Sequence, residues 1–385
     1  MDFDYVVAPC LILLVAILIS WRCIRRIFML RAKGYRMWRR VTEQVVLSLA
    51  VLMAVAVAAS TIFNALVIYH YRATIPGKFY NVDDHKIHIY CTGQGSPTLI
   101  LDAGLGGDWT AWGAVQPTLS KTTRVCSYDR AGFGGSSARP GTRDADHITG
   151  ELHGLLTQAG ITGPIILMGH SIAGLYIRVY AERYPKEVAG LVLVDSSIPL
   201  QDKNPVFKAV IAREEGTHTA VERFLEQATF ILGVPRLMGL SSFVPPGWDP
   251  RVGKMMVEDY FSWDAAAEAE ARAAELKSFD QSGLEALRAK NFGNLPILIF
   301  SEDPNTPQFP GIPASLVKRL AVVWNQMQPQ LKDLSTRSRR IIAKGSGHPI
   351  PTERPDLLNK EVAIFIQQVR GTIPQPTDYG STTPE

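Results

Sequence analysis

The stretch ILMGHSIAGLYIRVYAERYP, Ile166 to Pro185, joins an apolar run to a helical pattern through Gly-His-Ser. A buried strand must turn into a helix there within a few residues, and Gly169 and Ala173 stand two positions either side of Ser171. A nucleophile elbow requires small residues at these positions, because its serine holds a strained backbone and larger neighbours would clash. A serine that only caps a helix leaves a similar pattern. The rest of the chain has to decide between the two interpretations.

Other short apolar, β-branched runs end in Gly, Asp, Ser or Cys: KIHIYC, TLILDAG, RVCSYD, GLVLVDSS and PILIFSED. Helical patterns separate the later runs, for example at Asp144–Gly160 and Ile172–Tyr184. This alternation predicts a mostly parallel sheet that is covered by helices on both faces. In such sheets the chemistry gathers at the carboxyl ends of the strands, so the polar residues there are the candidates for a site.

A serine hydroxyl is a weak nucleophile that needs a base within hydrogen-bond reach. Among the eight histidines, His348 lies in the glycine-rich loop GSGHP, after a last apolar run and before a C-terminal helical pattern. A late strand could therefore bring its imidazole to the active edge of the sheet. His170 lies beside the serine, where an elbow would point its side chain elsewhere. The backbone N–H of Ile172, at the positive end of the elbow helix, is a candidate donor to an oxyanion.

From about Phe79 to Gly371 the chain resembles the α/β-hydrolase superfamily, and more narrowly its bacterial capped esterase-type serine hydrolases. The resemblance rests on five stretches in the family's order: YCTGQGSPTLILDAGLGG, VCSYDRAGFGGSS, MGHSIAG, GLVLVDSS and GSGHPIPTERPDLL. It implies the α/β-hydrolase fold, with a mostly parallel eight-stranded sheet flanked by helices and a helical cap. It also makes Ser171 the nucleophile and His348 the base of a catalytic triad, the roles that the residues themselves indicate.

The resemblance leaves the acid of the triad open and adds a second oxyanion donor. Asp303 follows the strand after the cap, the commonest place for the acid in this superfamily, and it is slightly preferred although its turn is shorter than usual. Asp195 is the alternative, because some lipases of this fold supply the acid from the end of that strand. The loop after the third strand has Ala103-Gly104 where the family usually has His-Gly, and the N–H of Leu105 is the expected second donor.

The four cysteines have no metal-ligand spacing. The family's strand order sets Cys91 and Cys126 side by side on antiparallel strands, where a disulfide is feasible. Two buried free thiols are the alternative. A disulfide would persist only in an oxidising compartment. No metal or organic cofactor is implied.

Residues 1–73 predict a two-helix transmembrane hairpin. Tyr5–Trp21 and Val45–Tyr69 carry no charge, and each can cross the hydrocarbon layer, which takes about 20 residues. Between them Arg22–Arg40 holds eight Lys or Arg and no Asp or Glu. The positive-inside rule makes this basic loop cytoplasmic, which predicts a multi-pass protein whose hydrolase domain is extracytoplasmic, periplasmic or at the cell surface. A cleaved export signal near Ala59 is the alternative.

The remaining chain is predicted to form a hydrolase core at 74–199 and 295–371, interrupted by a helical cap at 200–294. The polar, proline-containing segment 372–385 is predicted to be a disordered tail. Residues 1–73 hold nine of the 40 Lys and Arg and three of the 36 Asp and Glu, so the rest is close to neutral. A nucleic-acid partner is therefore not expected.

Together these features predict a membrane-anchored serine hydrolase that cleaves carboxylic esters of small molecules through an acyl-enzyme, with lipid-like esters among the expected substrates. The serine nucleophile argues against the dehalogenases and epoxide hydrolases of the superfamily, which use a carboxylate. A peptidase or amidase of the same fold and a non-catalytic receptor for a small ligand are the alternatives, since fold alone does not fix function. The sequence does not indicate an oligomeric state.

Overall fold

The computed structural model describes residues 3–32, 36–216, 228–229, 232–239, 248–260, 265–306, 313–376 and 379–383. The chain divides into two compact units. One is an N-terminal helical hairpin, with which residues 232–239 of the predicted cap are grouped. The other begins at Pro76 and contains the sheet.

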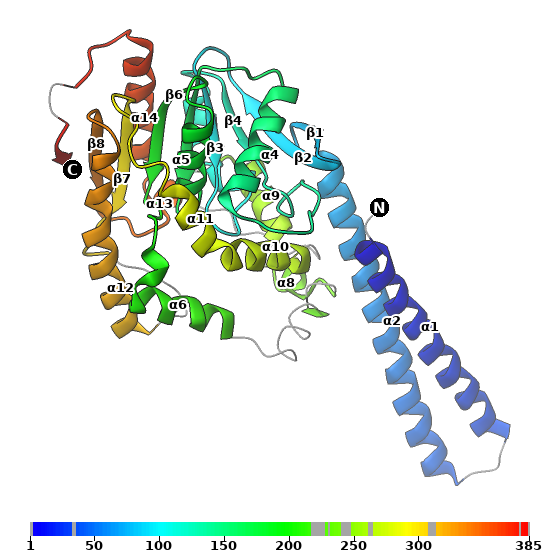
Figure 1. Cartoon of the computed structure of the whole chain (residues 1–385). Coiled ribbons are helices and arrows are strands. Elements are labelled where there is room, and N and C mark those ends of the chain that lie inside the picture. The colour runs from blue at the N-terminus through cyan, green and yellow to red at the C-terminus, as the bar shows by residue number, and fades with distance from the viewer. Residues whose placement is uncertain are drawn as a thin grey trace. The chain divides into compact units, whose positions relative to one another are not determined.

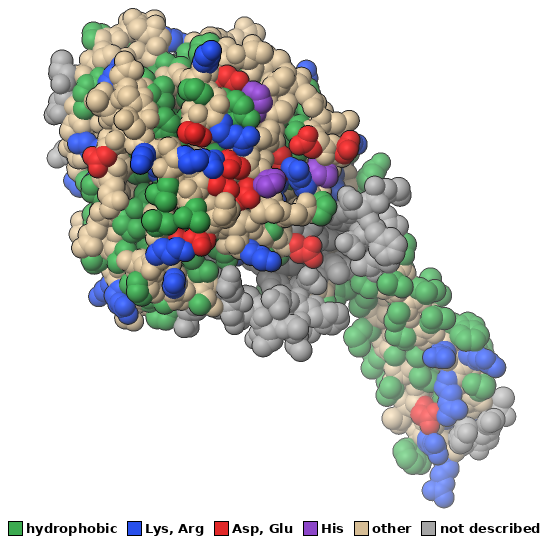
Figure 2. Space-filling view, viewed as in Figure 1, with side chains coloured by type: hydrophobic (Ala, Val, Ile, Leu, Met, Phe, Trp, Pro, Cys, Tyr) green, Lys and Arg blue, Asp and Glu red, His purple; other side chains and the backbone are tan. Residues whose placement is uncertain are grey.

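The N-terminal hairpin consists of two long helices that pack against each other, α1 (Phe3–Ala32) and α2 (Met37–Thr74) (Figure 1). Figure 2 shows hydrophobic side chains over one face of this hairpin and Lys and Arg side chains gathered toward one end of it. Among the described residues, α2 is the one helix long and apolar enough to cross a membrane. The prediction of two spans is therefore supported for one of them.

A mixed sheet forms the core of the second unit. Its order is β1-β2-β4-β3-β5-β6-β7-β8-β9, in which β1–β2 and β2–β4 are antiparallel and every other pair is parallel. The strands are β1 (Lys78–Val82), β2 (His85–Thr92), β3 (Thr98–Asp102), β4 (Val125–Tyr128), β5 (Ile165–His170), β6 (Val188–Val194), β7 (Ile297–Glu302), β8 (Ser338–Ala343) and β9 (Ser381–Thr382).

Helices cover both faces of this sheet, because its central strands are apolar on both sides. In the described part of this unit, the helices outside the predicted cap are η1 (Trp109–Trp112), α3 (Gln116–Leu119), α4 (Ala145–Gln158), α5 (Ala173–Arg183), α12 (Ala314–Met327), η4 (Gln328–Leu334), α13 (Ile350–Glu353) and α14 (Pro355–Arg370). One buried cluster joins strand residues such as Leu167 and Leu193 to α4 and α5. Their neighbours Met168 and Val192 join α14 and α3 on the opposite face. The mostly parallel, two-sided sheet is thus as predicted.

The described part of the insertion between β6 and β7 consists of helices joined by turns and irregular segments. It contains η2 (Gln201–Lys203), α6 (Pro205–Gly216), α8 (Val234–Leu237), α9 (Pro250–Tyr260), α10 (Ala265–Lys277) and α11 (Phe279–Ala286). Buried apolar residues of α6, such as Phe207, pack on Leu320 and Trp324 of α12. The predicted boundaries of a separate cap at 200–294 stay a prediction, since the described parts of this segment are divided between the two units.

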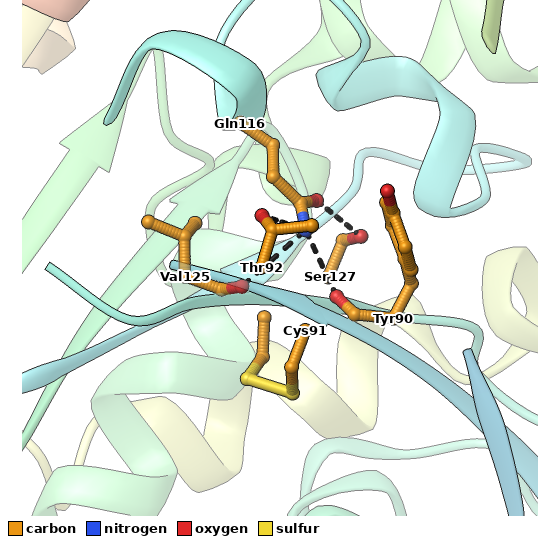
Figure 3. The surroundings of a disulfide bond; sticks show 7 residues. Tyr90, Cys91, Thr92, Gln116, Val125 and Ser127 are labelled. Atoms are coloured by element: carbon orange, nitrogen blue, oxygen red, sulfur yellow. Dashed lines mark hydrogen bonds between the residues drawn. A yellow bond between two sulfur atoms is a disulfide. The ribbon is translucent and has the colours of Figure 1, made fainter. Parts of the chain in front are cut away.

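Cys91 of β2 and Cys126 of β4 lie directly opposite each other, with Cα atoms 4.0 Å apart, and form a disulfide (Figure 3). On the other side of these strands, the Gln116 amide donates to the carbonyl oxygen of Tyr90 at 2.9 Å, while the hydroxyl of Ser127 donates to the Gln116 carbonyl oxygen at 2.7 Å. The antiparallel edge of the sheet is therefore tied together both covalently and by a buried amide.

Two expectations about the sheet need correction. The described residues form nine strands rather than eight. The ninth, β9, lies in the segment 372–385 that was expected to be unfolded, where Ser381 pairs with Arg340 and Thr382 with Ile341 of β8. Because β8 would otherwise be an open edge with free backbone groups, even a short tail segment can gain hydrogen bonds there.

Candidate active site

Ser171 lies on a sharp turn between β5 and α5 and has a positive φ of 57°. The turn needs small neighbours, because a Cβ at Gly169 would lie 2.8 Å from the carbonyl oxygen of Ala173. A Cβ at Gly174 would lie 2.3 Å from the Cβ of Ser196. The geometry is that of a nucleophile elbow, and the helix-capping interpretation does not account for it.

His348 lies in the loop between β8 and α13 and bridges a serine and an aspartate. Its Nε2 accepts from the Ser171 hydroxyl at 3.0 Å, and its Nδ1 donates to Oδ2 of Asp195 at 2.6 Å. The Asp195 carboxylate is fully buried. Its other oxygen accepts from the backbone N–H of Glu302 and from the indole Nε1 of Trp324, each at 3.0 Å. This relay has the geometry of a nucleophile, a base and an orienting acid.

The structure does not bring Asp303 to the imidazole, which corrects the preference for Asp303 over Asp195. The Asp303 carboxylate accepts instead from the backbone N–H groups of Gly345 and Asn305, both at 2.9 Å. Partial burial pulls its pKa upward, but these hydrogen bonds outweigh burial and lower the pKa below its usual value. Asp303 thus fixes its own loop, while Asp195, one strand away, holds His348.

The loop after β3 lies directly against the elbow. A Cβ at Gly104 would be 3.4 Å from the Cβ of Ser171 and 2.9 Å from Nδ1 of His170, so only glycine lets this backbone approach so closely. Leu105 packs against the buried cluster that contains Ile172. Among the described residues, no acceptor pairs with the backbone N–H of Ile172 or of Leu105. Both predicted oxyanion donors therefore remain candidates beside the serine.

A buried arginine, Arg130, holds the loop after β3 in place by hydrogen bonds to its backbone. Arg130 donates to the carbonyl oxygens of Ala103 at 2.7 Å and Gly104 at 2.9 Å. It also pairs with Asp102 at 2.7 Å and with Glu275 of α10 at 2.7 Å. Burial raises the pKa of Asp102 to about 6, although the positive charge of Arg130 opposes the shift. The loop is thus linked to a helix of the insertion by charge-assisted hydrogen bonds.

Sequence reasoning missed three residues around His348. Trp324 packs its ring edge-on against the imidazole, with ring centroids 5.6 Å apart, in addition to its hydrogen bond to Asp195. His170 was expected to point away, but its Nε2 donates to the carbonyl oxygen of His348 at 3.0 Å. Burial, followed by the nearby charge of His348, lowers the pKa of His170 to about 4, so it is neutral near pH 7. An aromatic residue on a helix far along the chain gives no sequence signal for such a role.

The third missed residue, Glu302, is a carboxyl that is fully buried beside the acid. Among the described residues neither of its side-chain oxygens has a hydrogen-bond partner. Burial raises the pKa of Glu302 to about 8, and the negative charges of Asp195, Asp303 and Glu353 add to the shift. The side chain is therefore mostly protonated near pH 7 and adds little charge next to Asp195.

The described residues contain no group of three or more His, Cys, Asp or Glu side chains that could hold a metal ion.

Comparison with known proteins identifies the family. Residues 99–361 match the model of the alpha/beta hydrolase family, and the chain belongs to this family. It is 30% identical over 169 residues to the uncharacterized protein YbdG of Bacillus subtilis, an alignment that covers 43% of this chain and 52% of YbdG. It is 24% identical to the bifunctional esterase/perhydrolase DCH of Acinetobacter calcoaceticus, covering 65% of this chain and 83% of DCH.

Among solved structures, the chain is similar to a membrane phospholipase A described as a bacterial virulence factor. The TM-score is 0.54 at 22% identity, and the match covers 86% of this chain and 99% of that one. This likeness supports the fold. The chain spans about half the length of several curated relatives that it matches, YbdG among them.

Proposed function

We propose that this protein is a serine hydrolase that cleaves carboxylic esters through an acyl-enzyme. The hydrogen-bonded relay from Ser171 through His348 to Asp195 is the observation that carries the proposal. Family membership supports a hydrolase, and one relative carries the name of an esterase.

The relay suggests how the reaction would proceed. His348 Nε2 takes the proton of the Ser171 hydroxyl as its oxygen attacks the ester carbonyl, and Asp195 stabilises the imidazolium that forms. The tetrahedral oxyanion accepts from the N–H groups of Ile172 and Leu105, each contributing about 3 to 4 kcal/mol to transition-state stabilisation. The imidazolium then gives its proton to the leaving alcohol. A water molecule activated by the same imidazole releases the acid and restores the serine.

Two assays test this proposal against its alternatives. A fluorophosphonate probe should label the wild-type chain and leave Ser171→Ala unlabelled, whereas a non-catalytic receptor would not be labelled. A p-nitrophenyl ester and a p-nitroanilide with the same acyl group then separate an esterase from a peptidase or amidase. Faster turnover of the anilide would contradict the ester assignment.

We further propose that α1 and α2 anchor the enzyme as a two-span hairpin, with the basic residues between their apolar stretches in the cytoplasm and the hydrolase unit on the opposite side. The length and apolar surface of α2 support the anchor. The eight basic residues of Arg22–Arg40 support the orientation, as does a disulfide between Cys91 and Cys126, which an oxidising compartment would preserve.

A membrane-impermeant maleimide tests the orientation in intact cells. Met37 and Ala73 are exposed at opposite ends of α2, so each can carry a single reactive cysteine in a background with Cys10→Ser and Cys23→Ser. Labelling of Ala73→Cys without labelling of Met37→Cys is expected. The reverse pattern would place the hydrolase unit in the cytoplasm. Labelling of both sites would show that α2 does not span.

A further inference from the structure

The segment 232–239, which contains α8, is bound to helix α2 by specific contacts. The Nε of Arg236 donates to Oδ1 of Asn64 at 2.6 Å, and the hydroxyl of Ser60 donates to the carbonyl oxygen of Leu232. Gly233 has a positive φ of 65°, and a Cβ there would lie 3.1 Å from the Cβ of Asn64. Segment 232–239 therefore lies closely against one face of α2, since Ser60 and Asn64 are one helical turn apart.

These contacts fall inside the uncharged stretch of α2, Val45–Tyr69. Ser60 and Asn64 lie nine and five residues before the end of this stretch, or about 13 and 8 Å along the helix axis. The stretch is only about 7 Å longer than the hydrocarbon core that it would cross. Even if the whole excess of about 7 Å extends beyond the core at the Tyr69 end, Ser60 lies inside the hydrocarbon core and Asn64 lies at its boundary. If the excess extends at the other end, both residues lie inside the core.

Polar side chains at such a depth require a protein partner. Asn64 and its neighbour Thr61 are both fully buried. By contrast, the apolar residues Leu52 and Phe63 of the same helix are 65% and 56% exposed. Segment 232–239 thus provides the protein partner of Ser60 and Asn64, while apolar residues of α2 such as Leu52 and Phe63 stay exposed.

Segment 232–239 has an apolar surface of its own at the same level. Leu237 and Met238 follow Arg236 directly and are 70% and 71% exposed. Both residues therefore lie close to the level of Asn64 on α2, because Arg236 binds that side chain.

We propose that segment 232–239 is a membrane-inserted element, in which Leu237 and Met238 lie among the acyl chains at the bilayer interface. The inference rests on the proposed span of α2. It commits to lipid as the partner, because Leu237 and Met238 are exposed apolar side chains close to a level of α2 that lies inside or at the hydrocarbon core of the proposed span. Part of the insertion between β6 and β7 then lies among lipids. The substrates expected for such an enzyme are esters that reside in the bilayer.

Depth-dependent fluorescence tests the insertion on the full chain. In a background with Cys10→Ser and Cys23→Ser, single cysteines at Met238, Leu52 and Ala73 carry an environment-sensitive dye. The protein is reconstituted in vesicles of phosphatidylethanolamine and phosphatidylglycerol whose acyl chains bear nitroxide quenchers. The label at 52, seven residues inside the apolar stretch, and the label at 73, beyond its end, provide the lipid and water references.

The label at 238 should emit at shorter wavelength than the label at 73 and be quenched by the nitroxides, as the label at 52 is. Emission like that at 73, while 52 is quenched, would overturn the inference and leave the anchor intact. Blue-shifted emission without quenching would also overturn it, because a protein contact would then cover Met238. If the label at 52 is not quenched, α2 does not span, and both the anchor and the inference fail.

An activity comparison tests the consequence for substrates. The double variant Leu237→Glu/Met238→Glu should hydrolyse a long-chain ester in vesicles about tenfold or more slowly, because two apolar side chains no longer enter the interface. Hydrolysis of a water-soluble butyrate ester should be unchanged. Val322→Glu, at an exposed apolar position of α12, is the matched control and should affect neither ester. Equal losses on both esters would contradict the inference, whereas a wild-type chain inactive on both would contradict the proposed hydrolase.

Discussion

Replacing Glu302 with Gln should stabilise the protein, and the gain should grow with pH. The buried carboxyl of Glu302 lies beside the carboxylates of Asp195, Asp303 and Glu353, and its oxygens have no partner among the described residues. Ionisation would place an uncompensated negative charge in this cluster. Glutamine has nearly the same shape, carries no charge and can donate to neighbouring carboxylates, so the variant removes the ionisation while retaining the packing.

The size of the effect follows from the difference between the folded and unfolded pKa of Glu302. The ordinary value is 4.5 and the folded value is about 8. Below pH 4.5 the carboxyl is mostly protonated in both the folded and the unfolded state, so its ionisation does not lower the free energy of unfolding. Between the two values the folded state binds more protons than the unfolded state, so stability is lost as pH rises, by about 1.4 kcal/mol per pH unit. The loss approaches about 5 kcal/mol at pH 8 and is constant above it.

The difference in unfolding free energy between Glu302→Gln and wild type should therefore rise from pH 5 to pH 8 and then level off. Urea unfolding of the full chain in detergent, followed by tryptophan fluorescence, measures this difference at each pH. Glu270→Gln, at an exposed position of α10, is the matched control and should leave the difference flat. A flat curve for Glu302→Gln would show that Glu302 finds a compensating partner and that the argument from its isolation is wrong.

Four further variants test the proposed relay and the loop after β3, which carries the candidate oxyanion donor Leu105. Asp195→Asn should lower kcat by about 10⁴ through the wrong tautomer of His348, while Asp303→Asn should change it little; equal losses would remove the distinction between the two carboxylates. Trp324→Phe keeps the ring packing and loses the hydrogen bond to Asp195, so kcat for a soluble ester should fall roughly tenfold or more at nearly unchanged KM. An unchanged kcat would mean that the indole N–H does not orient the acid. Gly104→Ala should lower kcat by about 10² or more with a similar melting temperature, because the added methyl group displaces the oxyanion loop; full activity would place the oxyanion elsewhere.

Much of the framework around the serine could be predicted from the sequence, because the signals are local. The apolar run before Gly169 is typical of a buried strand. The small residues around Ser171 are required sterically, because a Cβ added at Gly169 or Gly174 would lie less than 3 Å from its neighbours. His348 could be found in the same way, since a histidine in a glycine-rich loop after a late strand reaches the active edge by topology alone.

What could not be predicted depends on contacts between distant parts of the chain. Trp324 lies 129 residues from the aspartate to which it donates, on a helix whose pattern shows only an amphipathic face. The strand at Ser381–Thr382 depends on the open edge of β8 and on no apolar run of its own. Both the role of Trp324 and the strand Ser381–Thr382 depend on hydrogen bonds between distant segments, and the spacing of residues in the sequence does not predict such bonds.

The assignment of the acid illustrates this limit most directly. Asp195 and Asp303 each follow a strand of the parallel sheet directly, so both end at the same edge, and position alone ranks them equally. The structure separates them by their donors. Asp195 receives N–H groups from three distant residues, His348, Trp324 and Glu302. Asp303 receives its three from the backbone of Gly345 and from the backbone and side chain of Asn305. The side chain of Glu302 receives none among the described residues. Of the three carboxyl groups, Asp195 alone has the imidazole of His348 among its donors. The identity of the donors, rather than the position after a strand, therefore determines which of the three can stabilise an imidazolium.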